Sequence, residues 1–265
     1  MLRITLLSGE ELTSLPLAEL SDVKGLKQRL HSQHGLPPRF RQRLLHEGNT
    51  LDDAVKLETE MDLQAVLIDA SEDQRTRPEL CKAARDGLIT EVEALLQLPM
   101  DPDTADDEFC MASLMHASEN GHIDVVQLLL EAGAEKDLRD IDGRTALMAA
   151  AYDGHAPIVQ LLLEAGAQKD LSDNLGNTAL MLAASSGHAP VVQLLLEARA
   201  QTDLINADGN TALVDAALNG HARVVQQLFL EADAQNDLCD GLTLADDVQR
   251  LLETTKVPRV SEETC

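Results

Sequence analysis

Histidine is the side chain in this sequence whose spacing most suggests chemistry. The 265-residue chain has eight histidines, and four follow a glycine at intervals of 33 residues: Gly121-His122, Gly154-His155, Gly187-His188 and Gly220-His221. Imidazoles bind metals and transfer protons. Equal spacing, however, puts these four on successive packed helices, about 8–10 Å apart, which is too far for one shared ion. We therefore assign no metal site and expect each imidazole to hydrogen-bond local backbone at a helix turn.

The other reactive residue types form no catalytic pattern. Four cysteines lack the close paired spacing of a zinc site or disulfide framework, which favours a reduced intracellular setting: Cys81, Cys110, Cys239 and Cys265. The acidic run 106–108 is most simply a solvated loop. The sequence contains no Gly-rich phosphate loop, Gly-x-Ser-x-Gly turn or His-Glu-x-x-His pair. We predict that the protein is not an enzyme and uses no cofactor.

The 33-residue period identifies the elements that position these side chains. Thr-Ala-Leu recurs with it at 145–147, 178–180 and 211–213. A fixed period of this length indicates one helical unit stacked on copies of itself, because one unit cannot bury its apolar face alone. With an aromatic fraction of only 2%, the core must be built from Leu, Val and Ala, which favours closely packed helices.

One unit can be followed from Thr145. Thr145 is expected to cap a helix over 146–152, which Gly154 ends by taking positive φ. Pro157 suits the start of a second helix, whose apolar residues lie between 158 and 163 and which Gly166 closes. Asp173, Asn174 and Gly176 then suit a tight turn. The predicted unit is helix, turn, helix and β-turn loop.

The segment DIDGRTALMAAAYDGHAPIVQLLLEAGAQKDL closely resembles the ankyrin repeat, with Ala146 and Met148 in place of the usual Pro and His. Three units, from about Asp140, Asp173 and Asn206, fit closely. A fourth, from near Asp107, has Phe109-Cys110 instead of the Asp-Gly turn pair. The resemblance implies an all-α solenoid of about five repeats over 78–250, including degenerate caps, followed by a tail at 251–265.

Both ends of the array depart from the pattern. Residues 79–98 look like a helices-only terminal unit that caps the stack. The repeat from Asn206 has an extra residue around Gln227 and a shortened loop before Asp240-Gly241. The following LTLADDVQRLLETTKV either is a truncated cap or shows that the chain is a fragment of a longer array.

Ankyrin proteins bind partners through their loop tips and the groove side of their inner helices. The resemblance implies these protein-binding residues: Ile141, Asp142, Arg144, Tyr152, Asp153, Asn174, Leu175, Asn177, Asp208 and Asn210, with Ser185, Ser186, Ala207, Leu218 and Asn219 at equivalent positions. Tyr152 is the preferred anchor, because an exposed tyrosine offers a large contact area at low entropic cost. Asp215, where sister repeats have apolar residues, should lie partly exposed at the groove edge.

Residues before position 70 follow a different, α+β pattern. Strands are predicted at 2–7, 12–17, 43–46 and 63–68. Ser21-Asp22 should cap a helix over 23–33, and Gly35 should end it. A turn is expected at 47–49. These elements predict a small separate domain at 1–70, joined by a linker at 71–77 to the repeats.

The run LKQRLHSQHGLPPRFRQRLLHEGNTLDD (26–53) resembles ubiquitin, with one residue inserted around Arg39 to Arg41. The resemblance implies a β-grasp fold and an apolar contact patch of Leu7, Leu45 and Val66, flanked by Arg43. DASEDQRTRPEL stands where ubiquitin has its diglycine tail. The resemblance therefore implies a built-in ubiquitin-like module rather than a conjugatable tag.

Charge limits the partners. The formal net charge is −25, of which −3 lies in residues 1–69 and −22 in the rest. Such a chain repels nucleic acids and anionic membranes, and its partners should be proteins with basic patches. With no signal peptide and no long apolar segment, we expect a soluble protein in the cytoplasm or nucleus.

Three functions fit the sequence. The first is an adaptor whose ankyrin groove holds a client while the ubiquitin-like domain docks on ubiquitin receptors or proteasome subunits. The second is a plain ankyrin scaffold, and the third is a regulatory fragment of a longer enzyme.

Overall fold

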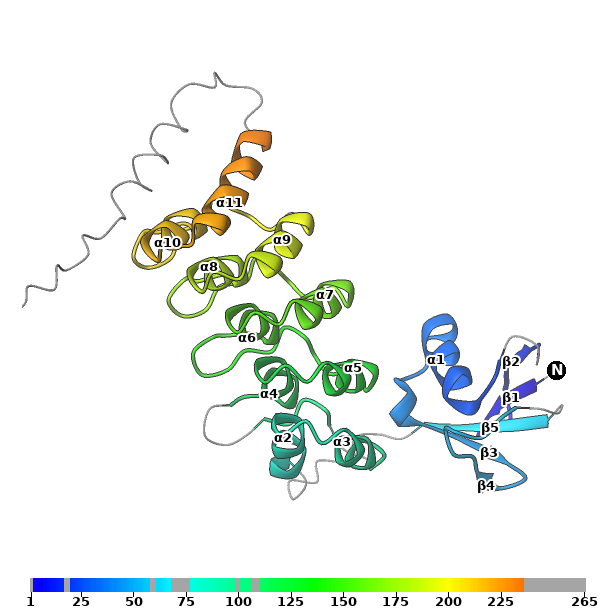
Figure 1. Ribbon diagram of the computed structural model, residues 1–265. Helices are drawn as coiled ribbons and strands as arrows, with labels where there is room; N and C mark the ends of the chain where they lie inside the picture. Colours follow the sequence, from blue (N-terminus) through cyan, green and yellow to red (C-terminus); the bar gives the residue numbers. More distant parts are fainter. Residues whose placement is uncertain are drawn as a thin grey trace, which may run out of the picture.

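The structure is a computed structural model that describes residues 2–16, 20–57, 61–67, 77–98, 101–105 and 110–235. A mixed α+β part over residues 2–67 is followed by a row of helix pairs (Figure 1). We call these the N-terminal part and the repeat stack. The predicted linker 71–77 lies almost wholly outside the described residues, and the predicted tail 251–265 does so entirely.

Over its described residues, the N-terminal part is a five-stranded mixed sheet with one α-helix. Its strands lie in the order β2-β1-β5-β3-β4, with β1 parallel to β5 and the other pairs antiparallel. The elements are β1 (Leu2–Leu6), β2 (Glu11–Leu15), α1 (Val23–His34), the 3-10 turn η2 (Arg39–Arg41), β3 (Gln42–His46), β4 (Asn49–Thr50) and β5 (Met61–Leu67). Alternate strand residues face a core that α1 covers through Val23, Leu26 and Leu30.

Local chemistry explains the bounds of α1. The carboxylate of Asp22 accepts a hydrogen bond from the Gly25 N–H at 2.7 Å, and Gly35 ends the helix with φ 65°. Both predictions are confirmed. One was wrong: Asn49, expected in a turn, begins the short strand β4, because the turn is completed by Glu47 (φ 50°) and Gly48 (φ 82°). The strand expected to extend to residue 17 ends at Leu15, and Ile68 lies outside the described residues.

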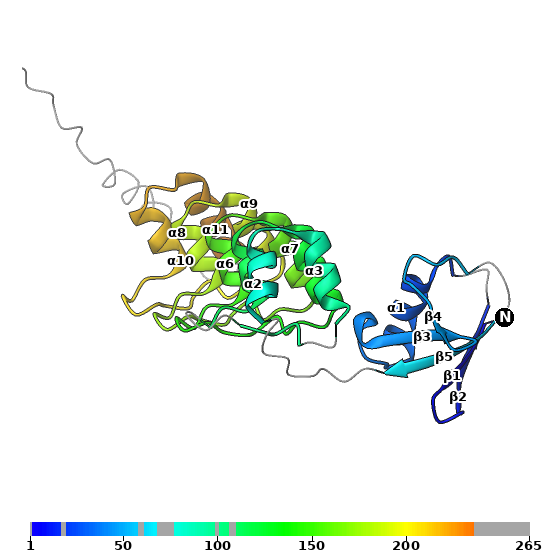
Figure 2. The same cartoon turned by 90° about the horizontal axis from the view of Figure 1, so that it is seen from below.

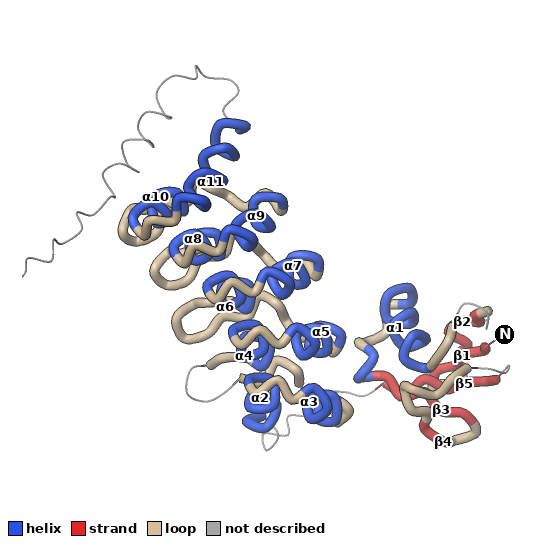
Figure 3. Tube along the Cα trace, viewed as in Figure 1, coloured by secondary structure: helices blue, strands red, loops and turns tan. Residues whose placement is uncertain are grey.

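The described residues of the repeat stack form five helix pairs in two rows, shown side by side in Figures 1 and 3. The inner row contains α2 (Arg77–Arg85), α4 (Ser113–Glu119), α6 (Ala146–Tyr152), α8 (Ala179–Ser185) and α10 (Ala212–Leu218). The outer row contains α3 (Ile89–Leu96), α5 (Ile123–Glu131), α7 (Ala156–Glu164), α9 (Ala189–Glu197) and α11 (Ala222–Gln235). One continuous apolar cluster joins neighbouring pairs, as the repeat period predicted.

Threonine caps and alanine contacts build the inner row. The hydroxyls of Thr145, Thr178 and Thr211 each accept a hydrogen bond from the backbone N–H three residues later, at 3.4 Å. The predicted helix over 146–152 is confirmed at both ends. Buried alanines such as Ala150, Ala183 and Ala216, all with no exposed surface, let neighbouring inner helices pack closely.

The histidines of the Gly-His turns hydrogen-bond a different part of the backbone from the one predicted. Nε2 of His155 lies 2.9 Å from the carbonyl oxygen of Glu119, and Nε2 of His188 lies 2.9 Å from that of Tyr152. Both carbonyls belong to the preceding repeat, so the expectation of a local backbone partner was wrong. His122 and His221 make the equivalent contacts to Arg85 and Ser185. These histidines therefore join adjacent repeats.

The same turns explain the glycines. Gly154 has φ 79°, and a Cβ on it would lie 2.5 Å from Nδ1 of His188. Glycine thus provides a left-handed turn and the space for the next imidazole. At Gly220, which no further His covers, no described residue lies within 4 Å of such a Cβ.

The ends of the stack depart from the central repeats. Cys110 adopts φ 53° at the position that Gly143 and Gly176 occupy in the next loops, which agrees with the substitution noted in the sequence; Phe109 itself lies outside the described residues. Residues 79–98 form the predicted terminal helix pair. Around Gln227, where an extra residue was expected, α11 extends to 14 residues against nine in α9. The LTLADDVQRLLETTKV segment lies outside the described residues.

Candidate protein-binding groove

The loops between repeats form one wall of a groove along the inner row. Asp140 Oδ1 accepts hydrogen bonds from the backbone N–H groups of Asp142 (2.9 Å) and Arg144 (2.7 Å). Asp173 closes the next loop in the same way, bonding the N–H groups of Leu175 and Asn177. These side chains replace the missing backbone partners of a tight turn, so each loop keeps a fixed shape.

Neighbouring loops are also bonded to each other. The Asn174 N–H donates to the Asp142 carbonyl at 2.9 Å, and the Ala207 N–H donates to the Leu175 carbonyl at 2.8 Å. Because the loops support one another, their tips present Ile141 and Leu175 to solvent, with 60% and 64% of their surface exposed. Exposed aliphatic side chains that gather on neighbouring loops can form a contiguous apolar patch, which marks an interaction surface.

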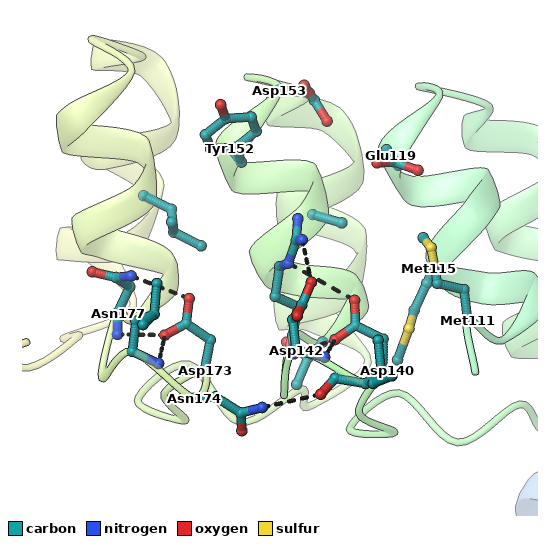
Figure 4. A pocket seen from close by; sticks show the side chains of 16 residues that line it. Met111, Met115, Glu119, Asp140, Asp142, Tyr152, Asp153, Asp173, Asn174 and Asn177 are labelled. Atoms are coloured by element: carbon teal, nitrogen blue, oxygen red, sulfur yellow. Dashed lines mark hydrogen bonds and ion pairs between the residues drawn. The ribbon is translucent and has the colours of Figure 1, made fainter. Parts of the chain in front are cut away.

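Between the loops and the inner helices lies a hollow of about 530 Å³ (Figure 4). Its apolar lining residues include Met115, Ala149 and Leu182. Figure 4 shows Glu119, Tyr152 and Asp153 near the ends of α4 and α6, at the opposite side of the hollow from Asp140 and Asp173.

The hollow is strongly acidic. Its lining contains five carboxylates, on Glu119, Asp140, Asp142, Asp153 and Asp173, against the single guanidinium of Arg144. Arg144 is already engaged: its Nη2 donates to Asp142 Oδ2 at 2.7 Å, and this bond raises the pKa of the guanidinium. Within the described part of the chain, Glu119 and Asp153 form no ion pair and remain exposed. They are the carboxylates available to a cationic partner.

The hollow brings together eight of the ten repeat residues predicted to bind protein: Ile141, Asp142, Arg144, Tyr152, Asp153, Asn174, Leu175 and Asn177. Asp208 and Asn210 belong to the next loop and do not line it. Asn210 instead donates to Asp215 Oδ1 at 2.9 Å. Asp215 is partly exposed, as predicted, and Asn206 is its second partner.

Sequence reasoning missed other lining residues, among them Met111 and Glu119. Each stands 33 residues before a position already considered: Met111 precedes Arg144, and Glu119 precedes Tyr152. Extending the repeat register one unit toward the N-terminus would have found them.

The predicted patch on the N-terminal part lies on one face of its sheet. Arg43 and Val66 are register partners across β3 and β5, and Leu45 pairs with Gln64. Their neighbours Leu44 and Ala65 are buried on the opposite face. Leu7 follows Leu6, which pairs with Ala65, and 62% of its surface is exposed. Arg43, Leu45 and Val66 therefore share the outer face of the sheet, and Leu7 lies at the end of the neighbouring strand β1.

Over the described ranges, no group of three His, Cys, Asp or Glu side chains is arranged to hold a metal ion. Nor does any helix there have the length and apolar character needed to cross a membrane.

The fold and the groove are those of a helical-repeat protein with a surface suited to binding a partner. Family comparison specifies it further. Residues 80–173 and 166–240 match the model for ankyrin repeats in three copies. The chain belongs to the ankyrin-repeat family, a family of non-catalytic protein-binding modules.

Proposed function

We propose that this protein is an adaptor whose ankyrin groove binds a client protein through a basic segment. The observation behind the proposal is the acidic hollow between α4, α6 and α8, with exposed carboxylates at Glu119 and Asp153 beside Tyr152. A lysine or arginine of the client would lie over the tyrosine ring between these carboxylates. Apolar residues on either side of it would contact Ile141 and Leu175.

A peptide library displayed on phage tests this specificity. Sequences with Lys or Arg next to an aliphatic residue should be enriched on the intact protein, and their binding should weaken as salt concentration rises. Glu119→Gln combined with Asp153→Asn should reduce binding. Asp208→Asn, outside the hollow, is the matched control and should leave it unchanged. Enrichment of acidic or purely apolar peptides would overturn the proposal.

We further propose that the N-terminal part is a β-grasp, ubiquitin-like domain that docks on ubiquitin receptors, including proteasome subunits. The strand order β2-β1-β5-β3-β4 and the parallel β1/β5 pair support the likeness noted in the sequence. Leu45 and Val66 lie on the sheet face that α1 leaves uncovered, and Leu7 follows the neighbouring strand β1, which supports a shared contact patch. Arg43, next to Val66, would contact an acidic group of the receptor.

Purified proteasome provides a defined test of this second interaction. The intact protein should co-sediment with it, and Leu45→Ala combined with Val66→Ala should abolish co-sedimentation. Leu175→Ala, in the groove, should not affect it. If neither the intact protein nor any variant binds proteasome, the ubiquitin-pathway role is wrong and a plain ankyrin scaffold remains. The peptide-library result does not depend on this outcome.

A further inference from the structure

The outer surface of the first repeats contacts the N-terminal part around a buried arginine. Arg39, in η2, has only 1% of its side chain exposed. Its Nη1 donates to Asp53 of the N-terminal part at 2.7 Å, and its Nε donates to Glu131, the last residue of α5, at 2.8 Å. Nη2 lies 3.8 Å from Glu93 of α3. One guanidinium thus joins carboxylates from both parts of the chain.

Apolar packing accompanies this charge contact. The Arg39 guanidinium stacks over the Phe40 ring at 3.9 Å. Phe40 is buried, and it belongs to the apolar cluster of the repeat stack rather than to the core of its own sheet. Pro38 packs against Gly133, the glycine that ends α5. The residues 38–41 therefore place an aromatic anchor and a buried arginine together, the combination that dominates protein interfaces.

The surrounding charges are complementary. Lys24 lies 3.8 Å from Glu131, and Arg41 lies 3.9 Å from Asp101. The N-terminal part is slightly acidic overall. In these ion pairs, however, it contributes only basic side chains, and the repeat stack contributes only acidic ones. Because a buried arginine is costly unless it is paired, this arrangement gives the contact a specific orientation.

We propose that α3 and α5 form a docking site for this chain's own N-terminal part, which holds the two parts as one rigid body. Figures 1 and 2 show the N-terminal part on the side of the outer helices, away from the loops. The groove and the outer sheet face accordingly stay open together. A partner on each would be held in a fixed relative orientation.

The repeats themselves supply matched controls. Gly133 and Gly166 end equivalent helices with φ 86° and 83°, but a Cβ on Gly133 would lie 2.6 Å from Pro38, whereas one on Gly166 meets only Lys136 at 3.8 Å. Arg199 occupies the third equivalent position with φ 62°, so a side chain is tolerated there. Likewise, Glu164 accepts a hydrogen bond from Gln160 as Glu131 does from Gln127, but among the described residues the Glu164 side chain has no other partner.

Backbone ¹⁵N relaxation of the intact protein tests the proposal. Both parts of the wild type should show one shared rotational correlation time. Gly133→Asn and, separately, Glu131→Ala should remove it, giving the N-terminal part a shorter time. Gly166→Asn and Glu164→Ala should retain it. Two different times in the wild type would overturn the proposal without any variant. So would a shared time that survives both interface variants, or equal effects from the control variants.

Discussion

The turns that join the repeats keep the same residues from repeat to repeat, whereas the positions that line the groove differ. At the turn, the same Gly-His pair occurs four times. Each imidazole lies against the turn glycine of the preceding repeat and hydrogen-bonds a backbone carbonyl of that repeat. Two residues before each of these glycines, on the groove side, the chain has Glu119, Tyr152, Ser185 and Leu218. A position that contacts the next repeat is constrained by that repeat. A position that faces solvent is free to match a partner.

This contrast predicts where substitutions affect stability, and the largest effect should come at a covered turn. Gly154→Ala should lower the free energy of unfolding by about 2–4 kcal/mol, since it adds left-handed strain and displaces His188 from its hydrogen bond. Gly220→Ala should cost only about 1–2 kcal/mol, the strain alone, because no imidazole covers Gly220. Urea unfolding followed by circular dichroism measures both. Equal losses would show that the imidazole contact contributes nothing.

A smaller loss is expected at the caps. Thr145→Ala removes the hydroxyl that accepts from the Met148 N–H and should cost about 0.5–2 kcal/mol, whereas Thr145→Ser keeps the acceptor and should cost less. The same unfolding measurement applies. If the serine variant is as unstable as the alanine variant, packing of the threonine methyl rather than capping is responsible.

Asp103, in the connection between α3 and α4, tests the contrast at a second contact between repeats. Its carboxylate accepts from the Glu135 N–H at 2.7 Å and joins two repeats, but burial raises its pKa. Because the folded state then binds the proton more tightly than the unfolded state, ionisation costs stability as pH rises through the folded pKa. Asp103→Asn keeps an acceptor oxygen and removes this cost.

Thermal unfolding from acidic to neutral pH measures this effect. The stability of the wild type relative to Asp103→Asn should fall as pH rises and then level off. A difference that is independent of pH would contradict the assigned cause.

The same contrast explains what the sequence could predict. The period located the helix pairs, Thr145 and Gly154 marked the bounds of α6, and the repeat register found eight lining residues of the hollow. Partners across repeats were not predictable: the acceptor of His155 lies 36 residues away, and nothing local in the sequence indicates it. The contact of Arg39 with Glu131, 92 residues apart, has the same origin. Neither contact follows from local propensity or periodicity.

The smallest effect on stability, and the largest on recognition, is expected at Tyr152. Its side chain is 52% exposed, and only its backbone carbonyl takes part in the turn, by accepting from His188. Tyr152→Ala should therefore change the free energy of unfolding by no more than about 0.5 kcal/mol.

Binding of the basic peptides selected on the groove should nevertheless weaken by at least about 1 kcal/mol in the alanine variant, measured by calorimetry. Tyr152→Phe keeps the aromatic face that a cation would contact and should retain most of the affinity. If the alanine variant unfolds easily, the Tyr152 side chain stabilises the fold rather than serving as a binding residue of the groove. A stable variant with unchanged affinity would remove the tyrosine from the recognition surface and leave Glu119 and Asp153 as its cation-binding groups.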